Sequence, residues 1–354
     1  MEEKISFASL GRVEAIRQLY EGSGYSAFAP AQFKSGAGRC ESVNRLFCEG
    51  VDFDLTYFPL KHLGYKSVVV VSSMLYAAFC TPKSLHFNLA ISAKLDFEQI
   101  KEFWSGVCSA AKDYGYTALS LDLSASVNGF YISVGAEGFC RELDDKRRPK
   151  AKSMDLVCLS GNLGGAFMGL KLLESEKENF AGAATNAAGG NGTSAGTTNA
   201  TGGVNTKRLE KHKRLVGDYL KPNLDVNIPQ NLADGGFYPT YGYCIDRGLS
   251  DAIKRLQRDS GLGVKIYVDK IPFGGGLFDL SKEMGLDAVS TALNGGEDYR
   301  ILFTLPLEQF EKFRHDFQTW QVIGHLAKED VGAAVVMPDG LEIPMRAQGW
   351  KKED

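Results

Sequence analysis

The sequence predicts a two-domain α/β protein, and three observations support this class. The chain has 354 residues, whereas one domain usually has about 150. The spacing of apolar residues changes repeatedly between two, which is typical of strands, and 3.6, which is typical of helices. A charged stretch at residues 144–152 separates two such series. We therefore expect one domain over residues 1–150 and a second over residues 151–354.

The first series of apolar segments predicts strands and one helix with clear ends. Asp96 and Gln99 have the spacing of a capping box, and apolar residues then recur at helical spacing until Gly115, a typical helix terminator. Strands are expected over three apolar runs: the valines at 68–71, residues 85–91 and residues 130–134.

The second series begins with a strand over residues 156–159. A glycine-rich turn, Gly161–Gly165, follows, and Leu163, Phe167 and Leu170 then lie at helical spacing on one face of the next helix. Such a turn either presents backbone N–H groups to a phosphate or simply allows close packing. The residues alone leave both interpretations open.

One segment differs sharply in composition from the rest of the chain. Residues 181–206 contain no charged and no aromatic residue, so they lack the apolar surface needed to offset the entropy of ordering them. We expect a solvated insertion in the second domain. The basic run at 207–215 that follows is interpreted as the solvated face of a helix.

The overall composition excludes several classes of partner. Lys and Arg total 40 against 43 for Asp and Glu, which argues against binding nucleic acid through bulk positive charge. No stretch approaches the ~18 apolar residues of a membrane span, and the start of the chain does not have the pattern of a signal peptide. We therefore expect a cytoplasmic protein that binds neither nucleic acid nor a membrane.

The seven cysteines occur singly, with no C-x-x-C pair. Cys108 and Cys158 lie in apolar runs, which favours buried, reduced thiols over disulfides or a zinc site.

Neither a G-x-x-x-x-G-K-[ST] phosphate loop nor a G-x-G-x-x-G motif is present. Asp52 and Asp54 are two residues apart, and on a strand they would share one face, as a metal site or as a solvated surface. Residues 294–299 predict a tight turn before a strand at 300–304, with carboxylates that either orient a ligand or only shape the turn.

Three blocks of sequence together resemble the thiamine-monophosphate kinase family. They are CEGVDFDLTYFPLKHLGYKSVVVV at 48–71, TALNGGEDYRILFTLPL at 291–307 and LEIPMRAQGW at 341–350. The resemblance implies the aminoimidazole ribonucleotide synthetase-like fold, in which the N-terminal domain forms a β-barrel across a dimer with ATP at its interface. It also implies transfer of a phosphoryl group from ATP to thiamine phosphate, giving thiamine diphosphate, with several Mg²⁺ ions as cofactors.

Most of the positions that match the family's metal-binding aspartates carry other residues here. These positions are Tyr25, Ser26, Asn44, Arg45, Met74, Cys244 and Arg247. Asp122 still matches a metal and nucleotide contact, and Asp52 stands where the family has a substrate-contacting histidine. Mg²⁺ prefers carboxylate oxygens, so its binding is expected to be impaired.

The positions that match ligand contacts are better preserved. The resemblance assigns Arg148 and Asp122 to the nucleotide and Asp52, Glu297 and Trp350 to the substrate. Trp350 would stack on the thiamine ring, although an aromatic residue closing the core is the alternative.

These replacements predict a binding protein with little or no kinase activity. It would act as a homodimer or pair with an intact relative. The alternative is an active phosphotransferase in which Arg45 and Arg247 replace the metal charge by pairing with phosphates, unless these arginines only form ion pairs with Asp246 or Glu49.

Overall fold

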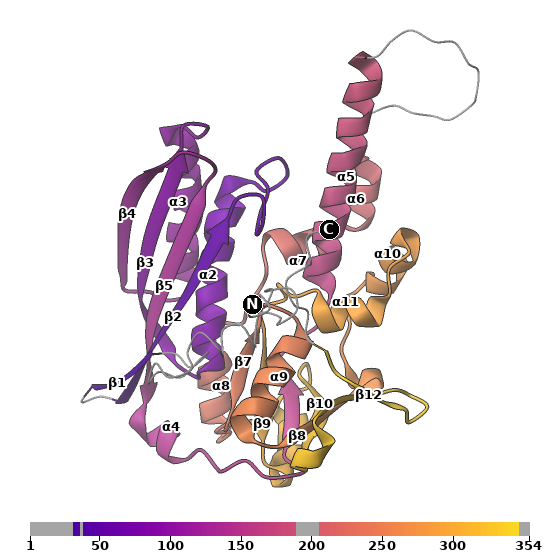
Figure 1. Cartoon of the computed structure of the whole chain (residues 1–354). Helices are drawn as coiled ribbons and strands as arrows, with labels where there is room; N and C mark the ends of the chain where they lie inside the picture. Colours follow the sequence, from indigo (N-terminus) through magenta and orange to yellow (C-terminus); the bar gives the residue numbers. More distant parts are fainter. Residues whose placement is uncertain (1–30, 36–37, 189–204, 347–354) are drawn as a thin grey trace, which may run out of the picture.

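A computed structural model describes residues 31–35, 38–188 and 205–346 and confirms the α/β class (Figure 1). The first sheet has the strand order β1-β2-β5-β3-β4, and only β3 and β4 pair in parallel. Its strands are β1 (Ala31–Ser35), β2 (Gly38–Cys48), β3 (Thr81–Ser92), β4 (Ala118–Ser126) and β5 (Tyr131–Arg141). The helices of this half are α2 (Leu60–Ala77), α3 (Phe97–Asp113) and α4 (Glu142–Lys146).

The second sheet has the order β12-β11-β8-β10-β6-β9-β7, with β8 and β11 its parallel pair. Its strands are β6 (Leu156–Leu159), β7 (Gly242–Ile245), β8 (Gly263–Tyr267), β9 (Arg300–Leu305), β10 (Gln321–Ala327), β11 (Ala333–Val336) and β12 (Glu342–Pro344). The α-helices of this half are α5 (Gly165–Ala188), α6 (Thr206–Lys211), α7 (Lys213–Leu220), α8 (Ile228–Asp234), α9 (Leu249–Ser260), α10 (Leu277–Met284), α11 (Ala288–Asn294) and α12 (Phe310–Asp316).

Helix α2 connects the two sheets, and it overturns one prediction. Val68–Val71 were expected to form a strand but lie in the middle of α2, where all four side chains are fully buried. The helix packs on α3, on β2 and β5 of the first sheet, and on β7 and β9 of the second (Figure 1). A helix covered on every side has no polar face, so its sequence lacks the helical period, and packing outweighs the modest strand preference of valine.

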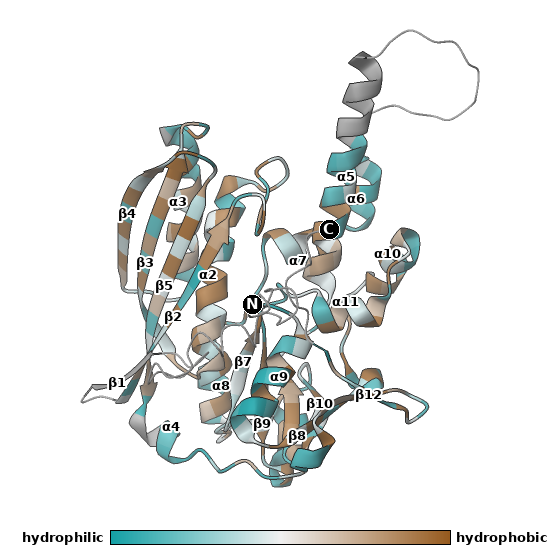
Figure 2. Ribbon diagram, viewed as in Figure 1, coloured by the Kyte–Doolittle hydropathy of each residue, from teal (hydrophilic) through white to brown (hydrophobic). Residues whose placement is uncertain are grey.

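The close contact between α2 and α3 depends on two glycines. A Cβ on Gly64 would lie 2.0 Å from the Phe103 carbonyl oxygen, and one on Gly106 would lie 1.9 Å from that of Lys61. Each helix therefore has a notch that admits the backbone of the other. The apolar faces of the strands and of α2 meet in this half of the molecule (Figure 2).

The capping box of α3 is confirmed. The Asp96 carboxylate accepts a hydrogen bond from the Gln99 backbone N–H (2.8 Å), and the Gln99 side chain accepts one from Asp96 N–H (2.9 Å). We expect Asp96→Ala to lower the free energy of unfolding by about 1 kcal/mol, because a helix-end N–H then loses its partner. Urea unfolding would measure this loss. Glu102→Ala, an exposed change later in the same helix, is the control, and an equal loss in both variants would contradict the capping role.

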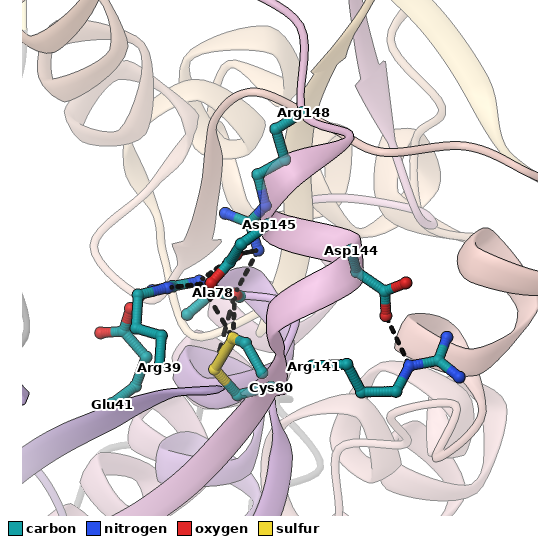
Figure 3. Close-up of a disulfide and its surroundings, with 9 residues drawn as sticks. Arg39, Glu41, Ala78, Cys80, Arg141, Asp144, Asp145 and Arg148 are labelled. Atoms are coloured by element: carbon teal, nitrogen blue, oxygen red, sulfur yellow. Dashed lines mark hydrogen bonds and ion pairs between the residues drawn. A yellow bond between two sulfur atoms is a disulfide. The ribbon is translucent and has the colours of Figure 1, made fainter. Parts of the chain in front are cut away.

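The cysteine prediction is wrong for one pair. Cys80 and Cys140 form a disulfide, because Cys80 directly precedes β3 and Cys140 lies in the adjacent antiparallel β5, where Thr81 pairs with Phe139. Sixty residues separate the two cysteines, so their spacing gave no indication of a bridge (Figure 3). Cys158 is a buried free thiol as predicted, whereas Cys108 is exposed on α3.

The predicted insertion is also partly wrong. Residues 181–188 continue α5, and Thr206 begins α6, with the Asn205 side chain accepting a hydrogen bond from Arg208 N–H. The remainder of the segment, 189–204, lies outside the described residues. The basic run at 207–215 is helical as expected, in α6 and α7. None of the helices in the described parts of the chain is long and apolar enough to cross a membrane.

Candidate functional site

Asp52 and Asp54 do not share a strand face, so the placement assumed by both interpretations of their spacing is wrong. Both lie in the turn region after β2, where hydrogen bonds from nearby backbone N–H groups hold them. Asp52 Oδ2 accepts from Cys48 N–H (2.9 Å), and Asp54 Oδ1 accepts from Thr56 N–H (2.8 Å). Asp54 pairs with Lys177 of α5, whereas Asp52 approaches the end of β7. The two carboxylates therefore belong to different ion pairs.

Four charged side chains form a closed ring between the two halves of the chain, hereafter the charge ring. Arg45 Nη2 of β2 lies 3.0 Å from Asp52 Oδ1, and Arg45 Nη1 lies 3.7 Å from Asp246 Oδ2. Arg247 closes the ring, with Nη1 4.0 Å from Asp52 Oδ1 and Nε 3.9 Å from Asp246 Oδ2. Positive and negative groups thus alternate, and each charge has two opposite neighbours.

The charge ring is buried on one side and open on the other. The side chains of Arg45 and Asp246 are 7% and 5% exposed, whereas that of Arg247 is 37% exposed. Burial by itself would lower the pKa of Arg45, but Asp246, Asp52 and other nearby groups outweigh it and raise the pKa. Arg255 of α9 adds a further cation, with Nη2 3.4 Å from Asp246 Oδ1. The Nε atoms of Arg45 and Arg247 are buried without a hydrogen-bond partner.

A buried ion pair lies beside the charge ring. Lys66 Nζ of α2 donates a 2.8 Å hydrogen bond to Glu297 Oε2, and its side chain is almost completely buried. Nζ also lies 3.7 Å from the centre of the Tyr219 ring, which adds a cation–π contact. Burial lowers the pKa of Lys66, and Glu297 opposes this shift.

Glu297 lies in the connection at 295–299 between α11 and β9, where a tight turn was predicted over 294–299; Asn294 ends α11 instead. Its backbone has φ +62°, a left-handed conformation that is uncommon outside glycine and recurs at functional sites. Glu297 N–H donates to the Asp246 carbonyl oxygen (3.0 Å), so the turn is fixed to the end of β7. The carboxylate pairs with Lys66, and its charge also contributes to raising the pKa of Arg45 in the charge ring.

A pocket of about 280 Å³ opens next to Asp52, between the turn after β2 and helices α5 and α7. Its walls carry four carboxylates, one lysine and two tyrosines: Asp52, Asp54, Glu174, Glu178, Lys177, Tyr57 and Tyr219. Burial raises the pKa of the Tyr57 hydroxyl, and the Glu174 and Asp54 charges raise it further. The pocket is therefore both aromatic and electronegative.

Those expected metal positions that the structure describes do not fit Mg²⁺. Nowhere in the described ranges do three or more His, Cys, Asp or Glu side chains form a group that could hold a metal. Asp52 and Asp246 are already paired with arginines. Cys244 is buried, and burial raises the pKa of its thiol, so it supplies no anionic ligand. Asn44 points away from Arg45, to the exposed face of β2.

The other predicted site residues lie elsewhere. Asp122 is exposed on β4, three positions from β2 in the sheet order. Met74 is partly buried in α2. Tyr25, Ser26 and Trp350 fall outside the described residues.

Arg148 lies beside the disulfide rather than in the charge ring (Figure 3). Its Nη2 donates to the Ala78 carbonyl oxygen (3.2 Å), which also accepts from Arg39 (3.1 Å). Burial and the nearby Arg39 lower the pKa of Arg148 to about 10, against the opposing effect of Asp145.

The glycine-rich turn at 161–165 binds an internal carboxyl group in place of a phosphate. Asp298 accepts hydrogen bonds from Gly164 N–H (2.9 Å) and Ala166 N–H (3.4 Å). The structure thus favours the packing interpretation for this turn. Asp298 is one of the two carboxylates of the turn predicted at 294–299. Sequence reasoning did not single out Lys66 or Arg255, although a lone lysine within the apolar run at 63–71 was a visible signal for Lys66.

Comparison with known proteins agrees with this fold. No family model matches the chain. The thiamine-monophosphate kinase of Aquifex aeolicus is 26% identical over 303 residues, covering 86% of this chain and 84% of the relative. The enzyme of Bacillus subtilis is 22% identical over 307 residues, covering 85% and 84%.

Solved structures give the same relationship. ThiL of Aquifex aeolicus complexed with AMPPCP and TMP superposes with a TM-score of 0.74 at 22% identity, covering 98% of both chains. HypE of Escherichia coli, a hydrogenase maturation protein, has a TM-score of 0.61 at 13% identity, covering 88% of this chain and 86% of its own.

These likenesses define the class: the chain has the aminoimidazole ribonucleotide synthetase-like α/β fold. Within that class it is a homologue of the thiamine-monophosphate kinases over most of its length, as the resemblance of its motifs predicted.

Proposed function

We propose that the chain is a thiamine-monophosphate kinase family protein that binds thiamine phosphate and nucleotide but transfers phosphoryl groups poorly or not at all. The charge ring carries this proposal. Phosphoryl transfer depends on positioning and on cations that neutralise the developing charge. Here Arg45 and Arg247 stand at two of the expected metal positions, and Asp52 and Asp246 already neutralise them.

The pocket beside Asp52 supports the choice of ligand. Its tyrosines and carboxylates suit the positively charged thiazolium group of thiamine, which aromatic faces and anions both attract. Glu297 and Asp52, the predicted substrate contacts, lie at the pocket or next to the charge ring. In this proposal the ring arginines, which pair with Asp52 on the pocket wall, bind the phosphate of the same molecule.

The nucleotide is assigned to the first half of the chain, residues 1–150, and the substrate mainly to residues 151–354. A bound AMPPCP in the Aquifex aeolicus relative supports the nucleotide class. Arg148 and Asp122 remain the proposed nucleotide contacts, and Trp350 remains a proposed thiamine contact. Mg²⁺ is not assigned, because the described residues do not fit it.

Strand β4 is the proposed dimer contact. It is the last strand of its sheet, so one edge is unpaired. Leu119, Leu121 and Leu123 are 36%, 40% and 54% exposed, and the other residues of β4 are exposed or partly exposed as well. An apolar edge strand is suited to pairing with another chain, here a second copy or an intact relative.

The activity assay is the direct test. Incubating the full chain with ATP, Mg²⁺ and thiamine monophosphate is expected to give thiamine diphosphate at least ~100-fold more slowly than the Bacillus subtilis relative does, since several charge-stabilising contacts are missing together. Chromatography of the products would measure the rate. Thiamine diphosphate formation at the rate of the relative would contradict the proposal.

A second function is favoured by one observation. The Nε atoms of Arg45 and Arg247 make no hydrogen bond, which leaves both guanidinium groups able to bind a phosphoryl group directly, as an active phosphotransferase would require. This alternative predicts product formation that persists in EDTA and is lost in Arg247→Ala.

A further inference from the structure

The charge ring contains one carboxylate that is poorly suited to its position. Asp52 Oδ2 accepts from Cys48 N–H, so only Oδ1 faces the arginines. That single oxygen serves Arg45 at 3.0 Å and Arg247 at 4.0 Å. Neither Nε has a hydrogen-bond partner, although Arg247 Nε lies 3.9 Å from Asp246 Oδ2. Guanidinium groups bind oxyanions best through paired donors. The N–H donors of Arg45 and Arg247 that face Asp52 therefore outnumber the single oxygen that accepts from them.

We propose that the charge ring is a metal-free oxyanion site in which Asp52 is an internal occupant that the phosphate of a ligand displaces. This inference rests on the proposed function only in placing a phosphorylated ligand at the ring. A phosphate has three terminal oxygens and up to two negative charges, so it satisfies both guanidinium groups more completely than Oδ1 does.

Asp52, not Asp246, is the carboxylate able to leave. Asp52 lies in a turn, lines the open pocket and has a 12% exposed side chain. Asp246 directly follows β7, is 5% exposed and is also paired with Arg255. A short movement of the turn would therefore carry Asp52 into the pocket, while Asp246 keeps the arginines in place.

Displacement would allow the charge ring to bind an oxyanion without a metal. With Asp52 in place the ring charges cancel, and without it Arg45 and Arg247 share one carboxylate. The resulting positive charge, partly shielded from water, attracts an oxyanion more strongly than the same charge would in solution. A divalent cation would have to compete with both guanidinium groups for Asp246.

Calorimetric titration with inorganic pyrophosphate in EDTA tests the inference. Asp52→Asn removes the internal anion while keeping its shape, and it is expected to tighten pyrophosphate binding about 10-fold. Glu49→Gln is the matched control, because this carboxylate accepts from Phe130 N–H in the same region and pairs with neither ring arginine. Adding Arg247→Ala to Asp52→Asn should abolish the gain. Thermal unfolding of each variant checks that it is folded.

Two outcomes would overturn the inference: equal affinities for the wild type, Asp52→Asn and Glu49→Gln, or binding that appears only when Mg²⁺ replaces EDTA. If Asp52→Asn does not fold, Arg247→Ala alone, at a partly exposed position, should weaken wild-type binding by a similar factor, and unchanged binding would overturn the inference. The titration involves no phosphoryl transfer, so its result is separate from that of the kinase assay.

Discussion

Replacing Glu297 with glutamine is expected to lower the free energy of unfolding by about 3 kcal/mol. The carboxylate is the ion-pair partner of Lys66, whose side chain is 2% exposed. Removing one member of a buried ion pair leaves the other charge uncompensated, which costs more than the pair contributes. Because Lys66 belongs to α2 and Glu297 to the turn before β9, the loss would weaken the contact between the two sheets. Urea unfolding would measure it.

The double variant Lys66→Met/Glu297→Gln separates charge from packing. Methionine fills a similar volume among Phe58, Tyr219 and Tyr299, so the double variant should recover most of the lost stability. Glu174→Gln, on the wall of the pocket, should change stability by less than about 0.5 kcal/mol. A double variant no more stable than Glu297→Gln would show that the lost charge is not the cause.

The way in which the stability of Glu297→Gln depends on pH follows from the pKa of Lys66. The folded-state pKa of Lys66 lies below its ordinary value of 10.5, so above that folded pKa the unfolded chain binds more protons than the folded one. Stability therefore rises with pH up to about 10.5. Without Glu297 to oppose the shift, this rise should be steeper in the variant than in the wild type.

Elements with one solvated face and the short buried strand at 156–159 could be predicted from the sequence, whereas the buried middle of α2 could not. The helix from Asp96 and the strand at 85–91 each have a buried and an exposed side, so their apolar periods are visible. The valines at 68–71 contact protein on all sides, so the sequence shows no spacing of apolar and polar residues that would indicate a helix. The disulfide was equally hidden, because only the pairing of β3 with β5 brings its cysteines together.

The candidate site was predictable by position but not by arrangement. The family motifs identified Arg45, Asp52 and Arg247 as substituted positions, and an ion pair with Asp246 was one expected outcome. A closed ring could not be foreseen, since its members come from segments about 200 residues apart. The other expected partner, Glu49, binds Phe130 N–H instead. Local spacing carries no information on which of several nearby carboxylates an arginine meets.

Asp298 should make the stability of the whole protein fall as the pH rises from about 4 to 7. Burial raises the pKa of this carboxyl to about 7, although hydrogen bonds from Gly164 and Ala166 and the charge of Arg300 oppose the shift. Asp218 also faces it and adds to the rise, and Arg214 lies beside Asp218.

The direction of this pH dependence follows from proton binding at Asp298. Between pH 3.8 and about 7 the folded chain binds more protons at this site than the unfolded chain, so the stabilisation is complete below pH 3.8 and lost by about pH 7. Asp298→Asn cannot ionise and keeps an acceptor for the turn. Relative to the wild type, this variant should therefore gain about 2–3 kcal/mol in unfolding free energy between pH 5 and pH 8.

Urea unfolding of both proteins at the two pH values measures this difference. Asn162→Ala, which alters the same glycine-rich turn without removing a titrating group, is the control and should differ from the wild type equally at both pH values. A constant difference between Asp298→Asn and the wild type would mean that the buried carboxylate does not take up a proton on folding. In that case the N–H groups that begin α5 hold a permanent negative charge, and the turn resembles an occupied anion site at every pH.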